Sequence, residues 1–290
     1  MGLQLKFNLI LVATFLVGLA LSSFLFYQLS RSEAMEQLQS QIDVIRAQAL
    51  SVRRYTAEEI QPLLADQSSV QFLPQTVPSF SAQTVFRNFR ERYPQFFYKE
   101  AALNPTNPSD QAKGWEVEVI ETLRKNPGME RDVRIRDTES GPFYTVTYPL
   151  VIRNADCLTC HSTPDKAPPS LIALYGSKNG FGWKLNETIG AQIISVPMAN
   201  ADSKIWRNFI LFISITSAIF LCLLVLLDIM LHRLVIRPVR SMAATAEKVS
   251  MGDASVPEYQ YPSADEVGSL SRSFNRMRRS LDSAMKMLES

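Results

Sequence analysis

Two long uncharged stretches divide the chain and predict membrane-spanning helices. Residues 7–27 form a run of about 21 residues without a charge, and residues 208–227 form a second run of about 20. Either run is long enough to cross a hydrocarbon core of ~30 Å as a helix. A cleaved signal peptide is the alternative for the first run, but its apolar core would be only about 7–15 residues long. We expect an uncleaved membrane anchor at residues 7–27 and a second span at 208–231.

A heptad-like pattern follows the first apolar run. Apolar residues recur at alternating three- and four-residue steps, at Met35, Leu38, Ile42, Ile45, Ala49 and Val52. Such a seam predicts a helix that continues outward from the membrane and pairs with a second copy in a dimeric stalk. An amphipathic helix packed on its own domain would give the same short pattern, and a dimeric stalk that packs at its far end against the sensor core fits both. Near Tyr55 the seam lapses, and we expect residues 53–64 to face the core.

The middle of the chain predicts a mixture of helices and antiparallel strands. Helical patterns cover residues 81–93 and 111–125. Residues 132–136 and 143–152 predict two strands, and the turn residues 139–142 join them in a hairpin. Residues 188–196 predict a last strand. The expected fold class is therefore α+β, with a small antiparallel sheet and flanking helices between the two membrane helices.

Two short heptad helices are predicted after the second span. The first seam comprises Val235, Val239, Met242, Ala246 and Val249. The second comprises Val267, Leu270, Phe274, Met277, Leu281, Ala284 and Leu288. The polar connector at 252–264 is too long for a tight antiparallel turn, so the two helices are expected to run parallel. Two chains would then form a parallel four-helix coiled coil.

Composition adds little beyond the membrane prediction. Hydrophobic residues make up 46% of the chain, which is high for a soluble protein and agrees with two spans. A formal net charge of +2 does not by itself argue for or against nucleic acid, and we expect no nucleic-acid partner. There are only three cysteines, and Cys222 lies inside the second apolar run. No pair is therefore left for a structural disulfide outside the motif at Cys157.

That motif is Cys157-Leu158-Thr159-Cys160-His161, the spacing that attaches a c-type haem. Each thiol can add to one vinyl group of the porphyrin, and the adjacent histidine is the proximal iron ligand. Half a zinc site and a redox dithiol are the alternatives. Zinc would require further cysteine or histidine ligands nearby, and the setting does not resemble the βαβ unit of a thioredoxin. We predict one covalent haem c held by Cys157, Cys160 and His161.

A glycine-rich loop between this motif and the last strand could contribute to the same site. Gly176, Gly180 and Gly182 permit backbone conformations or close approaches that a Cβ would forbid. Phe181 and Trp183 could wall a porphyrin. A tight surface loop with aromatic side chains pinned to the core is the alternative interpretation.

Charge and haem attachment together predict the orientation in the membrane. His232, Arg233, Arg237 and Arg240 follow the second span, which favours a cytoplasmic location for this end. Covalent haem is assembled outside the cytoplasmic membrane or in a lumen. We therefore expect residues 1–6 and 232–290 to be cytoplasmic and residues 28–205 to be periplasmic or lumenal, in a two-pass protein of the cytoplasmic membrane.

The segment after the second span resembles a HAMP linker. Pro238 lies just beyond the span, Gly252 precedes the connector, and Asp265-Glu266-Val267-Gly268 opens the second helix. The resemblance implies a parallel coiled coil that relays a signal to an output module. No kinase or receptor module follows in the sequence, so the output is expected to be a separate partner, such as a histidine kinase, unless the chain is truncated.

Residues 31–200 resemble the PAS-like, single-haem c-type sensor domains that are common in cyanobacteria and were long catalogued as a domain of unknown function. The matching segments are Arg54-Tyr55-Thr56 with Pro62, Val77-Pro78-Ser79-Phe80, Tyr98-Lys99-Glu100-Ala101, residues 103–108, residues 157–161, residues 179–183 and residues 189–192. The resemblance implies an antiparallel sheet flanked by helices, placed ahead of a HAMP linker.

The sixth iron ligand departs from the pattern of this family. Some relatives supply a cysteine or methionine from the long helix after the first span, and this chain has no cysteine there. Met35 and Met198 lie close to the spans, which leaves Met129 as the candidate ligand and Tyr55 as a remote one. We favour a vacant or weakly occupied sixth site, which could bind a diatomic gas.

The predicted function is a membrane-anchored haem sensor of redox state or of a diatomic gas. Its expected contacts are a second copy of the chain, membrane lipid and a cytoplasmic signalling partner. A membrane-tethered electron carrier is the alternative, but it has no use for the HAMP seams. An adaptor in which haem only stabilises the fold is a further alternative. No enzymatic activity is expected, because the single histidine outside the membrane leaves little basis for a catalytic triad.

Overall fold

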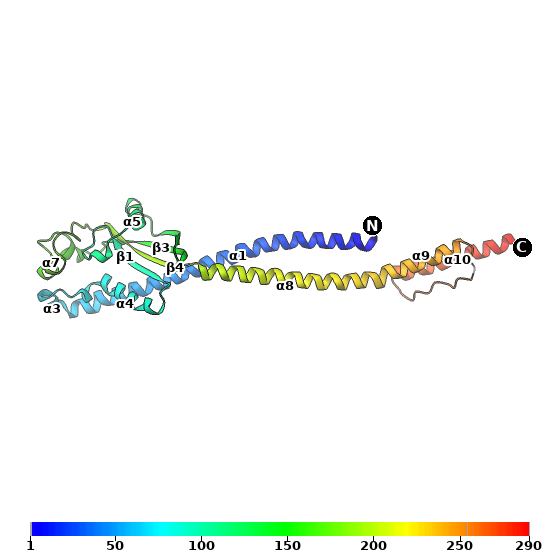
Figure 1. The fold of residues 1–290 in the computed structure, drawn as a ribbon, viewed down its shortest axis with the longest axis horizontal. Helices are drawn as coiled ribbons and strands as arrows, with labels where there is room; N and C mark the ends of the chain where they lie inside the picture. The colour runs from blue at the N-terminus through cyan, green and yellow to red at the C-terminus, as the bar shows by residue number, and fades with distance from the viewer. Residues whose placement is uncertain (1, 254, 290) are drawn as a thin grey trace. The chain divides into compact units, whose positions relative to one another are not determined.

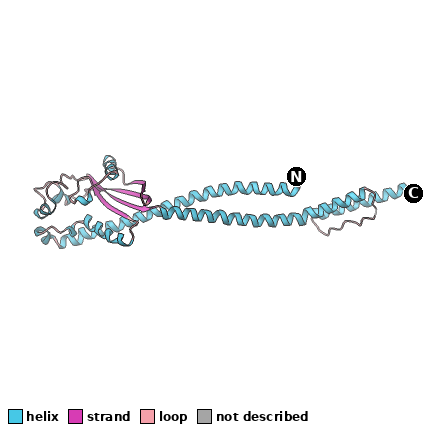
Figure 2. Ribbon diagram, in the orientation of Figure 1, coloured by secondary structure: helices cyan, strands magenta, loops and turns pink. Residues whose placement is uncertain are grey.

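The computed structural model describes residues 2–253 and 255–289. The chain divides into two compact units, one of residues 28–207 and one formed by the residues up to 27 together with those from 208 onward. Figures 1 and 2 show that every described strand belongs to the first unit. The second unit consists of helices and one connector.

The first unit is built on a four-stranded antiparallel sheet. Its strands are β1 (Phe97–Ala102), β2 (Asp132–Thr138), β3 (Gly141–Val151) and β4 (Thr188–Pro197), in the order β1-β4-β3-β2. Glu139 and Ser140 join β2 to β3, and Val133 pairs with Val146 across the hairpin. The predicted hairpin, last strand and α+β class are thus confirmed.

The edge strand β1 is absent from the sequence prediction because Lys99 and Glu100 interrupt its apolar pattern. Both charges have partners in the fold: the Lys99 ammonium lies 2.7 Å from a carboxylate oxygen of Glu116, and Glu100 pairs with Arg53. β1 also lies very close to β4, where a Cβ at Gly190 would stand 2.2 Å from the carbonyl oxygen of Ala101. Only glycine fits at that position.

The helices of the first unit are α1 (Leu3–Tyr55, shared with the second unit), the π-helical turn η1 (Thr56–Ile60), α2 (Gln61–Leu63), α3 (Ala65–Val70), α4 (Pro78–Arg92), α5 (Trp115–Lys125), α6 (Cys157–His161) and α7 (Pro169–Tyr175), with 3₁₀ turns η2 (Pro74–Thr76) and η3 (Pro108–Asp110). The helix predicted over 81–93 is α4. The helix predicted over 111–125 begins only at Trp115, because Gln111 forms a bridge to Ala102 and Ala112 donates to the same residue's carbonyl.

The apolar seam at residues 31–52 packs on its own domain, which was the alternative to pairing with a second copy. Leu38, Ile42, Ile45 and Ala49 are buried within the chain, where α1 packs with α4 against one face of the sheet. Met35 and Val52 pack against the same cluster. An intrachain sheet therefore covers the apolar seam.

The expectation that residues 53–64 face the core is wrong. Thr56 is buried, but Tyr55 is 59% exposed and Leu63 is 77% exposed.

The face of the sheet opposite α1 and α4 is covered by α5, in a second apolar cluster that includes Val119, Ile120 and Leu123.

The second unit contains two helices that qualify as candidate membrane spans by length and composition, one within α1 and the other within α8 (Ala199–Leu231). Their most apolar windows have mean hydropathies of 2.5 and 2.9. The helices pack through stacked rings of Phe15 with Phe220, whose centroids lie 3.7 Å apart. Near the end of α8, one carboxylate oxygen of Asp228 accepts hydrogen bonds from Gln4 and Asn8.

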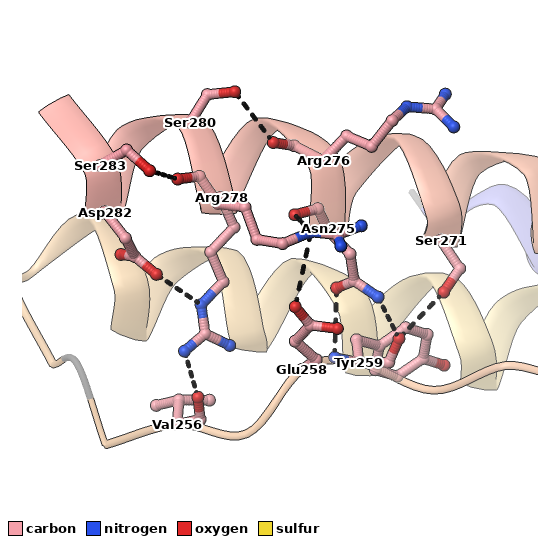
Figure 3. Close-up of polar contacts among 11 residues, drawn as sticks. Val256, Glu258, Tyr259, Ser271, Asn275, Arg276, Arg278, Ser280, Asp282 and Ser283 are labelled. Atoms are coloured by element: carbon pink, nitrogen blue, oxygen red, sulfur yellow. Dashed lines mark hydrogen bonds and ion pairs between the residues drawn. The ribbon is translucent and has the colours of Figure 1, made fainter.

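After α8 come the π-helical turn η4 (His232–Ile236), α9 (Arg237–Ser250) and α10 (Glu266–Glu289). The predicted pair of helices with a polar connector is thus confirmed. The connector is fastened to α10 by polar contacts: the Tyr259 carbonyl accepts from Ser271 and Asn275, and Glu258 pairs with Arg279 (Figure 3). Of the second predicted seam, Leu270 is 51% exposed and Met277 is 64% exposed, whereas the side chain of Leu288 lies outside the described residues.

Each π-helical turn lies just before a proline. Proline has no N–H to donate to the carbonyl four residues earlier, which is Glu58 for Pro62 and Leu234 for Pro238. Beside Pro238, side chains of the connector supply hydrogen-bond donors in place of the missing N–H. The Tyr261 hydroxyl lies 3.4 Å from the Leu234 carbonyl oxygen, and the Tyr259 hydroxyl lies 3.1 Å from that of Pro238.

Candidate functional site

The two thiols of the Cys157 motif lie on one helical turn. After β3, Asn154 accepts a hydrogen bond from the Asp156 amide, and the chain then forms the single turn α6. Residues three apart on a helix share a face, so Cys157 and Cys160 point to the same side. Both are free and partly buried, and burial raises the pKa of each thiol.

The ring of His161 is fixed in one orientation and one tautomer. Its Nδ1 lies 2.8 Å from the Gly180 carbonyl oxygen and 3.4 Å from the Thr106 hydroxyl, and its ring stacks on Trp183 with centroids 3.9 Å apart. A carbonyl oxygen can only accept, so Nδ1 carries the hydrogen. Burial lowers the pKa of His161, which favours the neutral ring. The neutral ring presents the lone pair of Nε2 to a metal.

The loop that holds His161 depends on glycine. Gly180 has φ +82°, and a Cβ there would lie 2.0 Å from Thr106 Oγ1. Asn104 fixes the loop from the other side, because its side chain accepts from the Gly180 amide and donates to the Phe181 carbonyl. The backbone amide of Trp183 donates to the His161 carbonyl. The structure thus brings together residues 104–106, 157–161 and 179–183.

A buried polar cluster between the end of α1 and the sheet was missed from the sequence. Arg53, on the last turn of α1, forms an ion pair with Glu100, whose side chain is only 2% exposed. The Tyr98 hydroxyl donates to the same carboxylate, and Gln192 donates to it at 3.3 Å. The Arg53 charge also lowers the pKa of the Cys157 thiol, against the larger effect of burial. An arginine near the end of an apolar seam is the one signal that could have pointed to this cluster.

The candidate methionine ligands pack in apolar clusters that do not include Cys157, Cys160 or His161. Met129 packs against the cluster between α5 and the sheet, whereas Met35 and Met198 pack in the cluster beneath α1. Tyr55 is exposed. Among the described residues, no hydrogen bond or ring contact joins any of the four to Cys157, Cys160 or His161.

The donor set fits haem c better than it fits a zinc site. Two unpaired thiols on one face of a turn precede a neutral imidazole whose Nε2 is free to bind iron. The described residues contain no group of three or more His, Cys, Asp or Glu side chains that could hold a metal ion. The thiols and imidazole therefore suit a group that brings its own macrocycle and needs only one or two protein ligands.

Comparison with known families gives a match over most of the first unit. Residues 31–197, more than half of the chain, match the family described as Tll0287-like. The chain belongs to the Tll0287-like family. Residues 230–283 match the HAMP domain, so the predicted combination of families is confirmed.

One solved structure is similar to this Tll0287-like chain, the crystal structure of the cyanobacterial heme-protein Tll0287. The two share 16% sequence identity, with a TM-score of 0.35, over 57% of this chain and 91% of that one. A comparison with curated proteins found no match.

The geometry around His161 predicts that Gly180 cannot be replaced. Gly180→Ala should destabilise the first unit by about 2–5 kcal/mol, because of a strained positive φ and a clash with Thr106. Gly182→Ala is the matched control, since Gly182 has φ +80° but nothing within 4 Å of the added Cβ. Thermal unfolding followed by circular dichroism should give a lower midpoint for Gly180→Ala. Equal midpoints would contradict the close approach to Thr106.

Proposed function

We propose that the chain is a membrane-anchored haem sensor, with one haem c attached to Cys157 and Cys160 and with His161 as the proximal ligand of the iron. The observation that carries this proposal is the 2.8 Å contact between His161 Nδ1 and the Gly180 carbonyl oxygen. It holds the imidazole in the tautomer that a metal-binding histidine uses, with Nε2 as the ligand.

The residues of the site have separate tasks in this proposal. The two thiols on α6 form the covalent links. Asn104 and Gly180 hold the loop that orients His161, and the Trp183 ring covers one side of the imidazole and excludes water from it. When bound, the haem supplies an iron that can change its oxidation state or take a small ligand.

The HAMP match favours a sensor over the rival electron carrier. The central strand β4 ends at Pro197, and α8 begins at Ala199 and continues toward η4 and α9. A shift in sheet packing would therefore act on α8 directly. Such a relay requires two packing arrangements that the haem state biases differently. An electron carrier would need none of these elements beyond an anchor.

We further propose the following topology and partners. Residues 28–205 lie on the periplasmic or lumenal side, whereas residues 1–6 and 232–290 are cytoplasmic. The basic side chains of Arg233, Arg237 and Arg240 after the second candidate span favour this orientation. The output passes to a separate signalling protein, such as a histidine kinase, or to a module that follows the HAMP domain.

Covalent attachment predicts the behaviour of a cysteine variant. The double variant Cys157→Ala, Cys160→Ala should lose peroxidase-type haem staining on a denaturing gel, because both thioether links are removed. Cys222→Ala is the control, since Cys222 lies in the second candidate span, and it should stain like the wild type. Persistent staining of the double variant would contradict covalent attachment at this motif.

A vacant or weakly occupied sixth position predicts gas binding. Carbon monoxide or nitric oxide should change the absorption spectrum of the reduced protein. The variant Met129→Ala should respond in the same way, because Met129 packs in the α5 cluster. A low-spin ferrous spectrum that neither gas alters, and that survives Met129→Ala, would show that another residue is the sixth ligand.

Homodimerisation is proposed to run through the HAMP helices and not through α1. Leu270 is 51% exposed on α10, whereas Ile42 is fully buried in the sensor core. A single cysteine at Leu270, in a Cys222→Ser background, should therefore crosslink between chains in membranes. Cysteines at Ile42 or at the polar position Arg272 should do so much less. Strong crosslinking at Ile42 would mean that the α1 seam opens toward a second copy.

A further inference from the structure

A cavity of about 200 Å³ lies in the first unit between α1, the turn before β1 and the start of α8. Polar side chains come from all three segments: Gln37 and Gln41 from α1, Gln95 from the turn and Lys204 from α8. Because a water molecule takes up about 30 Å³ of liquid, the space can hold several waters or one small polar group. It is smaller than the pocket of a drug-sized ligand, which measures roughly 300–1,000 Å³.

Part of the cavity wall is apolar and fixed by the core. Leu38 is buried in the cluster beneath α1, and Phe96 and Ala201 pack against the same cluster. Ala34 and Ala201 each contribute only a methyl group to the lining, which leaves room between α1 and α8. A ligand of this cavity therefore needs carbon atoms as well as polar ones.

The polar side chains of the cavity are available to a ligand. Within the described part of the chain, no hydrogen bond or ion pair joins the side chains of Gln41, Gln95 or Lys204 to another residue. Gln37 donates to Glu33 at 3.4 Å, on the exposed surface of α1. None of the described residues that line the cavity is acidic, and Lys204 carries the only charge among them. The lining therefore suits a group with one negative charge and further oxygen atoms for hydrogen bonds.

Lys204 lies close to the second candidate span along the chain. It precedes the uncharged run at residues 208–227 by four residues, which is about one turn or ~6 Å of helix. A bilayer with ~30 Å of hydrocarbon measures about 40–45 Å with its headgroup layers, so each layer adds roughly 5–8 Å. In a chain that spans the membrane at 208–227, the Lys204 ammonium therefore lies at the level of the lipid headgroups, where lysine attracts anionic lipids.

We propose that this cavity binds the headgroup of an anionic phospholipid that carries hydroxyl groups, such as phosphatidylglycerol. The inference rests on the membrane anchoring proposed above, but it needs no haem. The Lys204 ammonium pairs with the phosphodiester, and the amides of Gln41 and Gln95 bond to the headgroup hydroxyls. A choline headgroup fits less well, because its cation finds no carboxylate among the described lining residues.

The cavity lies at the junction where the sheet continues into α8. Pro197, the last residue of β4, lines it together with Ala201 and Lys204 from the first turns of α8. A headgroup that contacts α1 and α8 at once braces the two helices against each other. Lipid composition therefore biases the same helix that a signal from the first unit must move.

The experiment uses the full chain in nanodiscs of phosphatidylcholine that contain a minor fraction of phosphatidylglycerol. Lipids that stay on the protein after its release from the nanodisc are counted by native mass spectrometry. The wild type should retain phosphatidylglycerol in excess over its share of the bilayer. Lys204→Gln should lower that excess about fivefold, which is the effect of one lysine at an anionic surface. Arg207→Gln is the matched control, since Arg207 lies on the same helix outside the cavity lining, and it should keep the wild-type excess.

Ala201→Leu tests the cavity itself, because the larger side chain fills the space without changing any charge. It should lower the excess as Lys204→Gln does, and Lys204→Gln alone decides if Ala201→Leu does not fold. Equal retention of the two lipids by the wild type would overturn the inference. Equal losses in Lys204→Gln and Arg207→Gln would also overturn it, because they would show general attraction to the bilayer surface.

Two further outcomes would assign the cavity to another occupant and reject the lipid. Displacement of the retained lipid by soluble glycerol phosphate would identify a free phosphate as the ligand. Strong crosslinking between chains by Gln95→Cys, in the Cys222→Ser background, would show that a second copy fills the cavity. Failure of the proposed anchoring looks different, because the chain would then not enter nanodiscs at all.

Discussion

The hydrogen bond from His161 to the Gly180 carbonyl is the contact on which the site depends. It fixes the ring orientation and the tautomer together, so that a single nitrogen is left to bind a metal. The bond exists only because residue 180 adopts a positive φ beside Thr106, where any Cβ would collide. One missing methyl group in the loop therefore fixes the orientation and tautomer of a histidine 19 positions earlier.

The local patterns around this site were predictable because each depends on neighbours in sequence. The C-x-x-C-H spacing, the hairpin at 132–151 and the polar connector before α10 belong to this class. The seam at Ile42 shows the limit of such patterns. A period of 3.5 residues says that one face of a helix is covered, but the covering partner can be a second chain or the chain's own sheet. Here β3 and β4 cover it, from residues about 100–150 positions away.

The unpredicted parts share a physical cause. β1 carries Lys99 and Glu100 in its middle, and such charges disfavour a strand until partners arrive from elsewhere. Those partners, Glu116 and Arg53, come from helices on opposite faces of the sheet. Neither pairing can be read from a single stretch of sequence. The same holds for Met129, a loop residue after Pro127-Gly128 that packs against the cluster between α5 and the sheet.

The two π-helical turns have a consequence for how the long helices can change. A π turn contains one residue more than the α-helical turn it replaces, so it stores a local insertion in the hydrogen-bond ladder. If Thr56–Ile60 or His232–Ile236 returned to α-helical bonding, the residues beyond it would rotate by about 100° about the helix axis. At the end of each long helix, a change in the backbone hydrogen-bond pattern would therefore turn the residues that follow toward a different side of the helix.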